Sequence, residues 1–343
     1  MHTGLKHSAR VYLLLCIVLV VFFILDLALG SVKIPLDEII RTLFQGNSSR
    51  DEWTNIILNF RIPKAITAVL AGIALSISGL QMQTIFRNPL AGPYVLGISS
   101  GASLGVALVI LGYTSIVGSI FSGWAGKWLI VSASWVGSGI VLFLIMSVSA
   151  RIKDIMTILI LGMMFGSIIS AIVSALQYFS DEAMLKSYVI WTMGSVSNVS
   201  GEQLYLFSGS ILVGLLISLS SVKFLNMLLL GENYAQTLGL NLKLARLIIF
   251  LSTSILTGTV TAFCGPIGFI GIAVPHLSRL MLKTGDQKQL MVTSILAGAC
   301  VMLLSDMLSI IPGNGMVLPL NTVTAIIGIP IVIYIIMRNR VAR

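Results

Sequence analysis

Residues 11–30 read VYLLLCIVLVVFFILDLALG, and this stretch decides the class of the protein. It contains a single charged side chain, that of Asp26. A helix of about 20 apolar residues is long enough to cross the hydrocarbon core of a bilayer. Because backbone groups in lipid must satisfy one another within the segment, we expect a membrane-spanning α-helix here.

Nine further apolar stretches follow, and each predicts another spanning helix. They cover residues 62–85, 93–112, 128–149, 155–177, 203–222, 247–264, 267–282, 290–309 and 322–337. The segment 267–282 is short and contains Pro275, which predicts a broken or buried helix. The predicted fold class is an all-α polytopic membrane protein with about ten transmembrane helices.

The composition agrees with that class. Of 343 residues, 57% are hydrophobic and 10% are charged, whereas soluble domains carry about 25% charged residues. Soluble enzymes, disordered regulators and disulfide scaffolds are excluded. The apolar stretches are continuous rather than alternating, which excludes an outer-membrane barrel. No polar linker or soluble domain interrupts the chain, so residues 1–343 are expected to form one transmembrane domain.

The distribution of Lys and Arg predicts the orientation. With the N-terminus in the cytoplasm, 14 of the 21 basic residues lie inside, which favours cytoplasmic placement of both termini. The seven outer basic residues are Lys33, Arg41, Arg50, Arg61, Lys64, Lys127 and Lys186. Because the basic residues are scattered at the ends of apolar segments, the net charge of +9 is attributed to topology and not to nucleic-acid binding.

Most signatures of catalysis are missing from the sequence. It contains no GxxxxGK[ST] or HExxH pattern, and its three cysteines lie in apolar runs without metal-ligand spacing. The pattern Gly-x-Ser-x-Gly occurs at residues 97–101 and 101–105, both within the apolar third span. We therefore expect no catalytic residue, metal site or resident cofactor. Asp26 and Asp306 lie near span ends, where anchoring or a local hydrogen bond is favoured over a proton relay.

Two other classes of function stay open at this point. An intramembrane enzyme would need a catalytic pair within the membrane. An ion-coupled secondary transporter is suggested by a possible inverted repeat. The spacing of Gly72, Gly79 and Pro89 recurs in Gly258, Gly265 and Pro275.

Small residues mark the third span. Gly97, Gly101 and Gly105 share one helix face, with Ser99 and Ser100 beside them. Such a face allows close helix packing. It would equally form a smooth, weakly polar wall beside a passage, and the two interpretations are compatible.

The segment 224–246 lies on the cytoplasmic side of this topology. Residues 232–238 predict a short helix, Gly239 a left-handed stop, and Asn241 the N-cap of a second short helix. A compact helix–turn–helix with few charges suits insertion into a groove on a partner protein. An ordinary connecting loop is the alternative.

At this point the residues resemble the FecCD family, the membrane permeases of type II ABC importers for iron-siderophore complexes, haem and vitamin B12. The resemblance covers essentially the whole chain. Its motifs are Arg61-Ile62-Pro63-Lys64, Gly79 with Asn88-Pro89-Leu90-Ala91-Gly92-Pro93, residues 96–102 (LGISSGA), the Ala235–Gly239 loop, residues 265–271 (GPIGFIG) with 275–279 (PHLSR), and residues 324–330 (TAIIGIP).

The resemblance implies a type II ABC importer permease fold, with ten helices per subunit and a passage between the two subunits of a homodimer or a pair of close paralogues. A separate ABC ATPase subunit dimer would bind ATP and Mg²⁺ and would grip the coupling residues. These are Glu232, Ala235, Leu238, Gly239 and Asn241. Arg61 and Lys64 would meet an extracytoplasmic substrate-binding protein. The gate and pathway would use Asn88, Pro89, Leu90, Gly97, Ser99, Ser100 and Gly101.

The expected function is therefore ATP-driven import of an iron chelate, either an iron-siderophore complex or haem, across the cytoplasmic membrane of a bacterium. Cobalamin import by the same family is the alternative, and an ion-coupled transporter is a remote one. Membrane lipid surrounds such a subunit, and no nucleic acid is expected as a partner.

Overall fold

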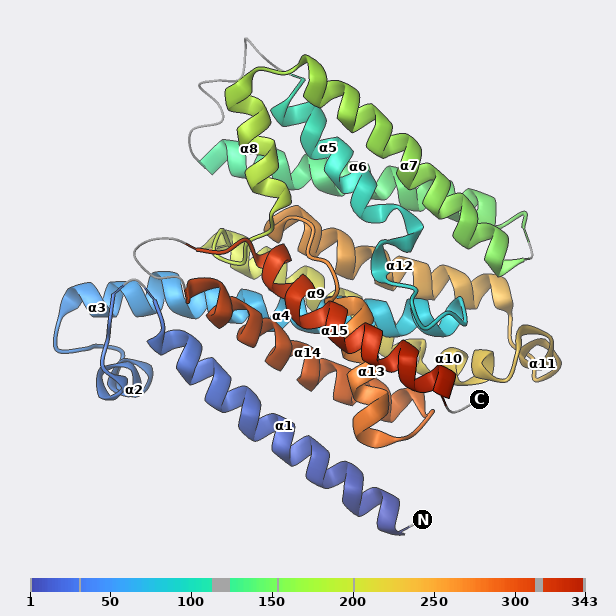
Figure 1. The fold of residues 1–343 in the computed structure, drawn as a ribbon, viewed down its shortest axis with the longest axis horizontal. Coiled ribbons are helices and arrows are strands. Elements are labelled where there is room, and N and C mark those ends of the chain that lie inside the picture. The colour runs from blue at the N-terminus through green and yellow to red at the C-terminus, as the bar shows by residue number, and fades with distance from the viewer. Residues whose placement is uncertain are drawn as a thin grey trace. The chain divides into compact units, whose positions relative to one another are not determined.

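The computed structural model describes residues 2–30, 32–112, 124–152, 154–199, 201–311 and 317–341, and across these residues every regular element is a helix. Figure 1 labels them along the chain. In order they are α1 (His2–Ala28), α2 (Leu36–Gln45), α3 (Asp51–Ile56), η1 (Ile57–Arg61), α4 (Ile62–Ile85), η2 (Pro93–Leu96), α5 (Ile98–Ile110), α6 (Trp124–Ser149), α7 (Ile155–Phe179), α8 (Glu182–Thr192), α9 (Glu202–Ser220), α10 (Val222–Leu229), α11 (Glu232–Thr237), α12 (Leu242–Cys264), α13 (Ile270–Leu282), α14 (Gln287–Ile310) and α15 (Leu320–Val341).

Each of the ten predicted spans coincides with a helix. Within the described ranges, seven helices are long and apolar enough to cross a membrane. They are α1, α4 together with the preceding α3 and η1, α6, α7, α9, α12 and α14. The other three spans correspond to the shorter apolar helices α5, α13 and α15. The all-α polytopic class is confirmed. The short span predicted around Pro275 is α13, which continues through that proline.

Helix boundaries differ from the prediction in two spans. The span predicted over 93–112 is interrupted, because Pro93–Leu96 forms a 3₁₀ turn and Gly97 adopts a φ of +72° before α5 begins. The second span begins upstream of residue 62, since α3 and the π-helical turn η1 lead continuously into α4. In the span over 93–112, the turn at Pro93 and Gly97 therefore delays the start of the α-helix, although the whole stretch is apolar.

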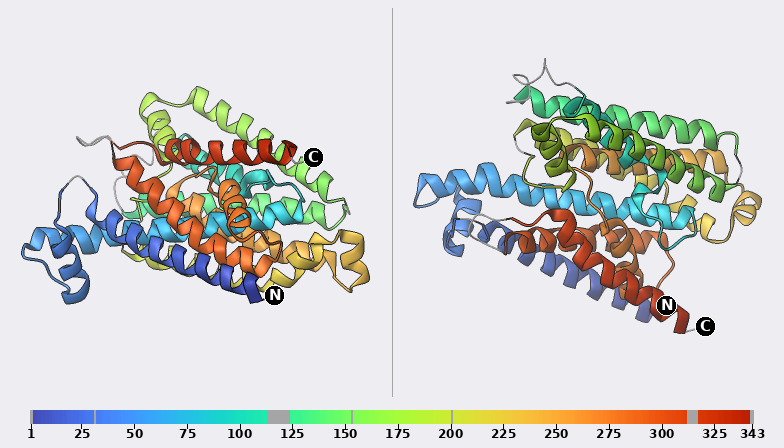
Figure 2. Two further views of the ribbon diagram at one scale, coloured as in Figure 1. Left: turned by 60° about the horizontal axis from the view of Figure 1, so that its bottom comes forward. Right: turned by 45° about the horizontal axis from the view of Figure 1, so that its top comes forward.

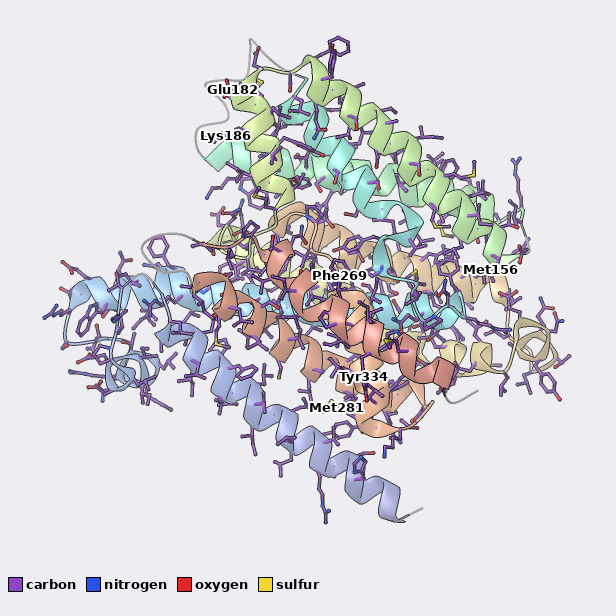
Figure 3. The ribbon with its side chains drawn as sticks, in the orientation of Figure 1. Met156, Glu182, Lys186, Phe269, Met281 and Tyr334 are labelled. Atoms are coloured by element: carbon purple, nitrogen blue, oxygen red, sulfur yellow. The ribbon has the colours of Figure 1, made fainter. Side chains whose placement is uncertain are left out.

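Three polar stretches hold helices that were not predicted, and the first of them, residues 31–61, contains α2 and α3. Residues 178–202 contain α8, on which Glu182 and Lys186 lie one turn apart (Figure 3). Residues 222–229 form α10, whose Leu225 and Leu228 are buried. The second short helix predicted after Asn241 is the first turn of the long α12.

The chain divides into two compact units. The first contains residues 1–77, 195–209 and 268–343, and the second contains residues 78–194 and 210–267. Two of the four boundaries fall within α4 and α9, so each of these helices contributes to both units. The prediction of one transmembrane domain over residues 1–343 stays a prediction.

In the first unit, α1 packs along α14, and α14 packs against α13 and α15 (Figure 2). The backbones of α4 and α14 touch, because a Cβ atom on Gly72 would lie 2.2 Å from the carbonyl oxygen of Gly298. The Ser76 hydroxyl donates to the carbonyl of Ser294 at 2.8 Å in the same contact. In lipid the hydrophobic effect does not drive helices together. Small residues allow close van der Waals packing instead, and short hydroxyls add hydrogen bonds between helices.

The second unit is built on close packing of α5 against α6, with α7 and α12 beside them. A Cβ on Gly105 would lie 2.0 Å from the carbonyl oxygen of Ala133, and one on Gly101 would lie 2.5 Å from that of Gly137. The predicted close packing of the small-residue face is therefore confirmed for Gly101 and Gly105.

A buried amide fixes the last turns of α4 in the second unit. The Gln81 side chain donates to the hydroxyls of Ser218 and Ser221 at 2.9 and 3.1 Å. Its carbonyl oxygen accepts from Ser252 and Thr253 at 3.0 and 2.9 Å. All four hydrogen-bonding positions of the amide are used. The network ties α4 to α9 and α12, just ahead of the predicted gate.

Candidate functional site

The predicted coupling segment is a tight turn between α11 and α12, which we call the elbow (residues 231–241). Gly239 adopts a φ of +88° and ends α11, as predicted. The amide of Leu240 donates to the carbonyl of Ala235 at 2.9 Å and closes the turn. Asn241 then caps α12, because its side-chain oxygen accepts from the amide of Leu244 at 3.1 Å. The predicted short helix, its stop at Gly239 and the cap at Asn241 are confirmed, whereas the second helix is the long α12 and not a short one.

Apolar side chains cover the outside of the elbow and the turns beside it. Ala235 is fully buried and fixes the inner face of α11. The exposed ones are Leu229 at 47%, Leu230 at 63%, Tyr234 at 67%, Leu238 at 55% and Leu244 at 47%. An exposed apolar patch of this kind on a polar loop is typical of a protein-binding surface.

An ion pair between Arg246 and Glu232 joins the elbow to α12. Arg246, on the second turn of α12, is 4% exposed and its Nη2 lies 2.8 Å from Oε1 of Glu232. Its Nη1 donates to the carbonyl of Ile152 at 3.3 Å. Hydrogen bonds from Thr157 lower the pKa of the nearby Asp154 carboxyl, and Arg246 lowers it further. One guanidinium therefore joins α11, α12 and the turn before α7.

The predicted gate residues form a closed turn after α4. The side-chain oxygen of Asn88 accepts from the amide of Leu90 at 2.9 Å, and its carbonyl accepts from Ala91 at 3.0 Å. Pro89 and Leu90 are exposed. The turn is therefore short and held by its own hydrogen bonds, and its tip is exposed. Its role as a gate stays a prediction.

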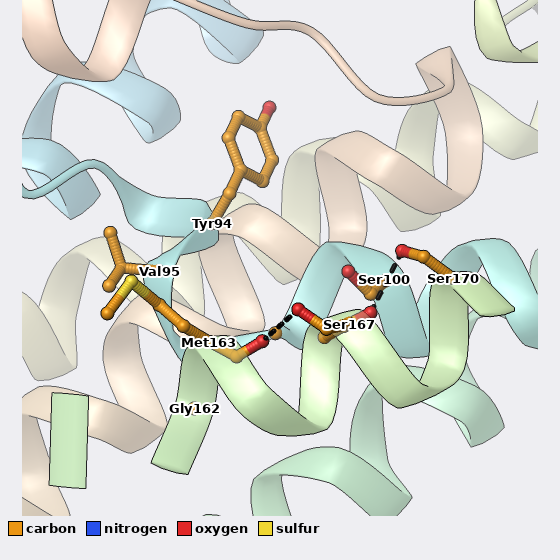
Figure 4. Close-up of a pocket in the computed structure, with 9 residues that line it drawn as sticks. Tyr94, Val95, Ser100, Gly162, Met163, Ser167 and Ser170 are labelled. Atoms are coloured by element: carbon orange, nitrogen blue, oxygen red, sulfur yellow. Dashed lines mark hydrogen bonds between the residues drawn. The ribbon is translucent and has the colours of Figure 1, made fainter. Parts of the chain in front are cut away.

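Two predicted pathway residues, Gly97 and Ser100, line a cavity of about 410 Å³ in the second unit (Figure 4). The rest of its wall is Tyr94, Val95, Gly162, Met163, Gly166, Ser167 and Ser170. Ser99 is buried, and Gly101 faces α6. Gly97 also contacts α7, because an added Cβ atom would lie 2.9 Å from the carbonyl oxygen of Gly162. Passage of a substrate along them stays a prediction.

The cavity wall is weakly polar. Ser167 and Ser170 donate to carbonyls of their own helix, those of Met163 and Gly166, at 3.0 and 2.9 Å (Figure 4). Their protons are therefore used within α7, and only weak acceptor positions are left for a ligand. The phenol of Tyr94 donates to the carbonyl of Ile267 and accepts from its amide. Sequence reasoning missed this tyrosine, because its partner is far along the chain.

Arg61, predicted to dock a binding protein, is 8% exposed. Its Nη1 donates to the carbonyl oxygens of Leu27 and Ala28 at 2.6 and 3.1 Å, and its Nη2 donates to that of Val32. Gly30 leaves room for the guanidinium, since a Cβ there would lie 2.7 Å from Nη2. In this structure Arg61 satisfies the carbonyls at the end of α1, and the docking role stays a prediction.

Lys64, the second predicted docking residue, forms an ion pair. Its Nζ lies 2.6 Å from Oδ2 of Asp306, with the two side chains 18% and 4% exposed. The carboxyl of Asp26, which is 2% exposed, lies near that of Asp306. The prediction that Asp306 acts as a local partner near a span end is confirmed. The docking role of Lys64 stays a prediction.

Replacing Lys64 with alanine is expected to lower stability by on the order of 1–3 kcal/mol, between the values for exposed and buried pairs. The reason is that Asp306 would be left nearly buried without its cation. Thermal unfolding in detergent measures this change. The double variant Lys64→Met with Asp306→Leu is expected to recover much of the loss. A Lys64→Ala variant with unchanged unfolding and weakened binding-protein affinity would instead favour docking alone.

The comparisons with known proteins span nearly the whole chain. The FecCD transport family matches residues 18–338. The hemin transport system permease protein HmuU of Yersinia pestis is 34% identical over 331 residues, covering 92% of this chain and 93% of the relative. The vitamin B12 import system permease protein BtuC of Klebsiella pneumoniae is 32% identical over 340 residues, covering 99% and 97%.

A solved structure of similar fold agrees with these relatives. It is described as an inward-facing conformation of an ABC transporter of metal-chelate type. Its TM-score to this chain is 0.82 at 30% sequence identity, with 96% of this chain and 99% of that chain covered. The all-helical fold described above is therefore the fold of a type II ABC importer permease.

Proposed function

We propose a substrate and a mode of coupling from the premise that this chain belongs to the FecCD transport family. It is a multi-pass membrane protein and the permease of an ABC importer of that family. We infer that its cargo is an iron chelate, either haem or an iron-siderophore complex. The observation that carries this inference is the similarity to a hemin permease over 92% of the chain.

The work of transport comes from a separate ABC ATPase dimer in this proposal. The elbow supplies the contact, because Tyr234 and Leu238 project from it and are mostly exposed while Ala235 anchors it from within. A groove on the ATPase would bury these side chains. Movement of the groove during ATP hydrolysis would then shift α11, and Gly239 and Asn241 would preserve the shape of the elbow.

The composition of the cavity wall is consistent with a bulky cargo that is never bound tightly. Glycines and internally bonded serines present little charge and few free donors. Such a wall suits a metal chelate already enclosed by its own ligands. Cobalamin is the second candidate, because the vitamin B12 permease BtuC matches 99% of this chain. Two copies of the permease, or this chain with a close paralogue, would form the passage between them.

Orientation and outer recognition are part of the proposal. The beginning of α1 and the end of α15 lie at the same end of the first unit (Figures 1 and 2). The excess of Lys and Arg on that side supports a cytoplasmic location for this end, and we infer that the membrane is the cytoplasmic membrane of a bacterium. An extracytoplasmic substrate-binding protein would deliver the cargo to the outer ends of the helices, where Arg61 and Lys64 lie.

Uptake into proteoliposomes tests this function. The permease is reconstituted with its ATPase and binding protein, and accumulation of haem, a ferric siderophore and cobalamin is measured. One iron chelate is expected to accumulate only with ATP and an active ATPase. Accumulation of cobalamin alone would select the second candidate. Uptake that persists with an inactive ATPase and stops when the ion gradient collapses would contradict the proposal.

The turn at Gly239 gives a sharper prediction. Valine there is strained by about 1–2 kcal/mol in the left-handed region, although nothing lies within 4 Å of the added Cβ. We expect Gly239→Val to hydrolyse ATP with much less uptake per ATP. The matched control is Gly239→Asn, because asparagine tolerates this backbone conformation. Normal uptake by the valine variant would count against the elbow as the coupling contact.

A further inference from the structure

A single arginine connects the elbow to the predicted gate. Arg87 directly precedes Asn88, and its Nη2 donates to the carbonyl of Leu228 at 3.2 Å. That carbonyl lies in the last turn of α10 and also accepts from the amide of Gly231 at 3.2 Å. The end of a helix carries negative partial charge, so a guanidinium is well placed there.

The guanidinium also packs against the backbone where the elbow begins. Gly231 adopts a φ of +115°, which other residues rarely adopt, and α11 starts at the next residue. A Cβ atom on Gly231 would lie 3.3 Å from Nη2 of Arg87. The missing side chain therefore lets Arg87 lie directly on the chain that enters α11. A shift of α11 would therefore displace the Arg87 side chain.

On the gate side, Arg87 lies between the buried end of α4 and the exposed Asn88–Leu90 turn. Phe86, just before it, is fully buried and stacks on Phe250 with ring centroids 6.1 Å apart. Arg87 itself adopts a φ of +47°, a conformation uncommon outside glycine. The turn that follows is held together by the hydrogen bonds of Asn88. A displacement of the Arg87 side chain would therefore reach Asn88–Leu90 more readily than the buried end of α4.

We propose that Arg87 is a positioning residue that transmits movement of the elbow to the Asn88–Leu90 turn. The inference rests on the proposed function, in which an ATPase moves the elbow. Arg246 joins Glu232 of α11 to α12, whereas Arg87 contacts the chain just before α11, at Leu228 and Gly231. Of these two arginines, Arg87 is the one that adjoins the predicted gate.

The test follows the two ends of this connection separately in the reconstituted complex with its ATPase. Nitroxide labels are placed on Tyr234→Cys in the elbow or on Leu90→Cys in the turn, in a Cys16→Ala background. Their spectra are compared without nucleotide and after trapping with ATP and vanadate. Arg87→Ala and Arg87→Lys are the variants. The matched control is Arg151→Ala, at an exposed arginine after α6.

With Arg87 intact, both labels are expected to respond to trapping. In Arg87→Ala the label at Tyr234 should respond and the label at Leu90 should not, and uptake per ATP should fall about tenfold. Arg87→Lys should recover part of the Leu90 response, because an ammonium can still donate to the Leu228 carbonyl. Arg151→Ala should leave both responses intact.

A Leu90 response that survives in Arg87→Ala would overturn the inference. Loss of both responses in that variant would overturn it too, because Arg87 would then serve docking and not transmission. If Arg87→Ala does not fold, a Leu90 response in Arg87→Lys no different from that of the unaltered protein, with uptake per ATP still low, would do the same. A Tyr234 label that is silent with Arg87 intact would contradict the proposed function itself.

Discussion

The Gly137→Ala variant is expected to lose most of its folded population. Gly137 is on the face of α6 that touches α5, and a Cβ atom there would lie 2.0 Å from the carbonyl oxygen of Gly101. The obstructing atom is backbone, so no side-chain rotation can relieve the overlap. Overpacking of this kind costs about 3 kcal/mol or more when the two helices must separate. The yield of monodisperse protein in detergent and its unfolding temperature measure the effect.

Gly139→Ala is the matched control for that variant. Gly139 is two residues further along α6, and nothing lies within 4 Å of a Cβ added there. Alanine is favoured over glycine within a helix by up to about 1 kcal/mol, so this variant should be as stable as the unaltered protein or slightly more so. Equal stability of the two alanine variants would refute the close approach of α5 and α6.

The second large effect is expected from Arg246→Ala. The change removes the guanidinium that joins Glu232 to the carbonyl of Ile152. Removing one partner of a buried pair costs about 3–5 kcal/mol, and because Glu232 is 24% exposed we expect about 2 kcal/mol here. The loss is confined to the fastening of α11, so the protein should still fold. ATP-driven uptake should fall more than about tenfold, because a loosened elbow no longer carries movement into the permease.

Two further variants define the origin of that effect. Glu232→Gln keeps an acceptor for Arg246 and should be milder than Arg246→Ala. Lys243→Ala removes an exposed basic residue three positions earlier on α12 and should leave uptake unchanged. Uptake and ATPase activity are measured on the same reconstituted samples. Full uptake by Arg246→Ala would show that the ion pair has no part in coupling.

The elbow could be predicted almost completely from the sequence because its interactions are local. Gly239 and Asn241 act within about one turn of their own positions, as a helix stop and a helix cap. The gate turn was located only through the resemblance of Asn88-Pro89-Leu90 to a family motif. Arg87 gave no separate signal, since its partner at Leu228 is 141 positions away.

The small-residue face shows the limit of periodicity. Spacing alone placed Gly97, Gly101 and Gly105 on one side of a helix, but it could not say what lies opposite them. The structure puts α6 against Gly101 and Gly105, and it puts α7 against Gly97, where an added Cβ atom would lie 2.9 Å from the carbonyl oxygen of Gly162. Glycines that face different helices are identical in sequence.

By itself, the sequence determined the number and order of the apolar helices and the shape of the elbow. Both depend on runs of apolar residues and on hydrogen bonds between close neighbours, and these are written in consecutive residues. Only the tertiary structure decided that Arg246 meets Glu232, that Lys64 meets Asp306, and that Gly137 differs from Gly139. These contacts depend on which helix faces which, and that is set by packing between segments far apart in the chain.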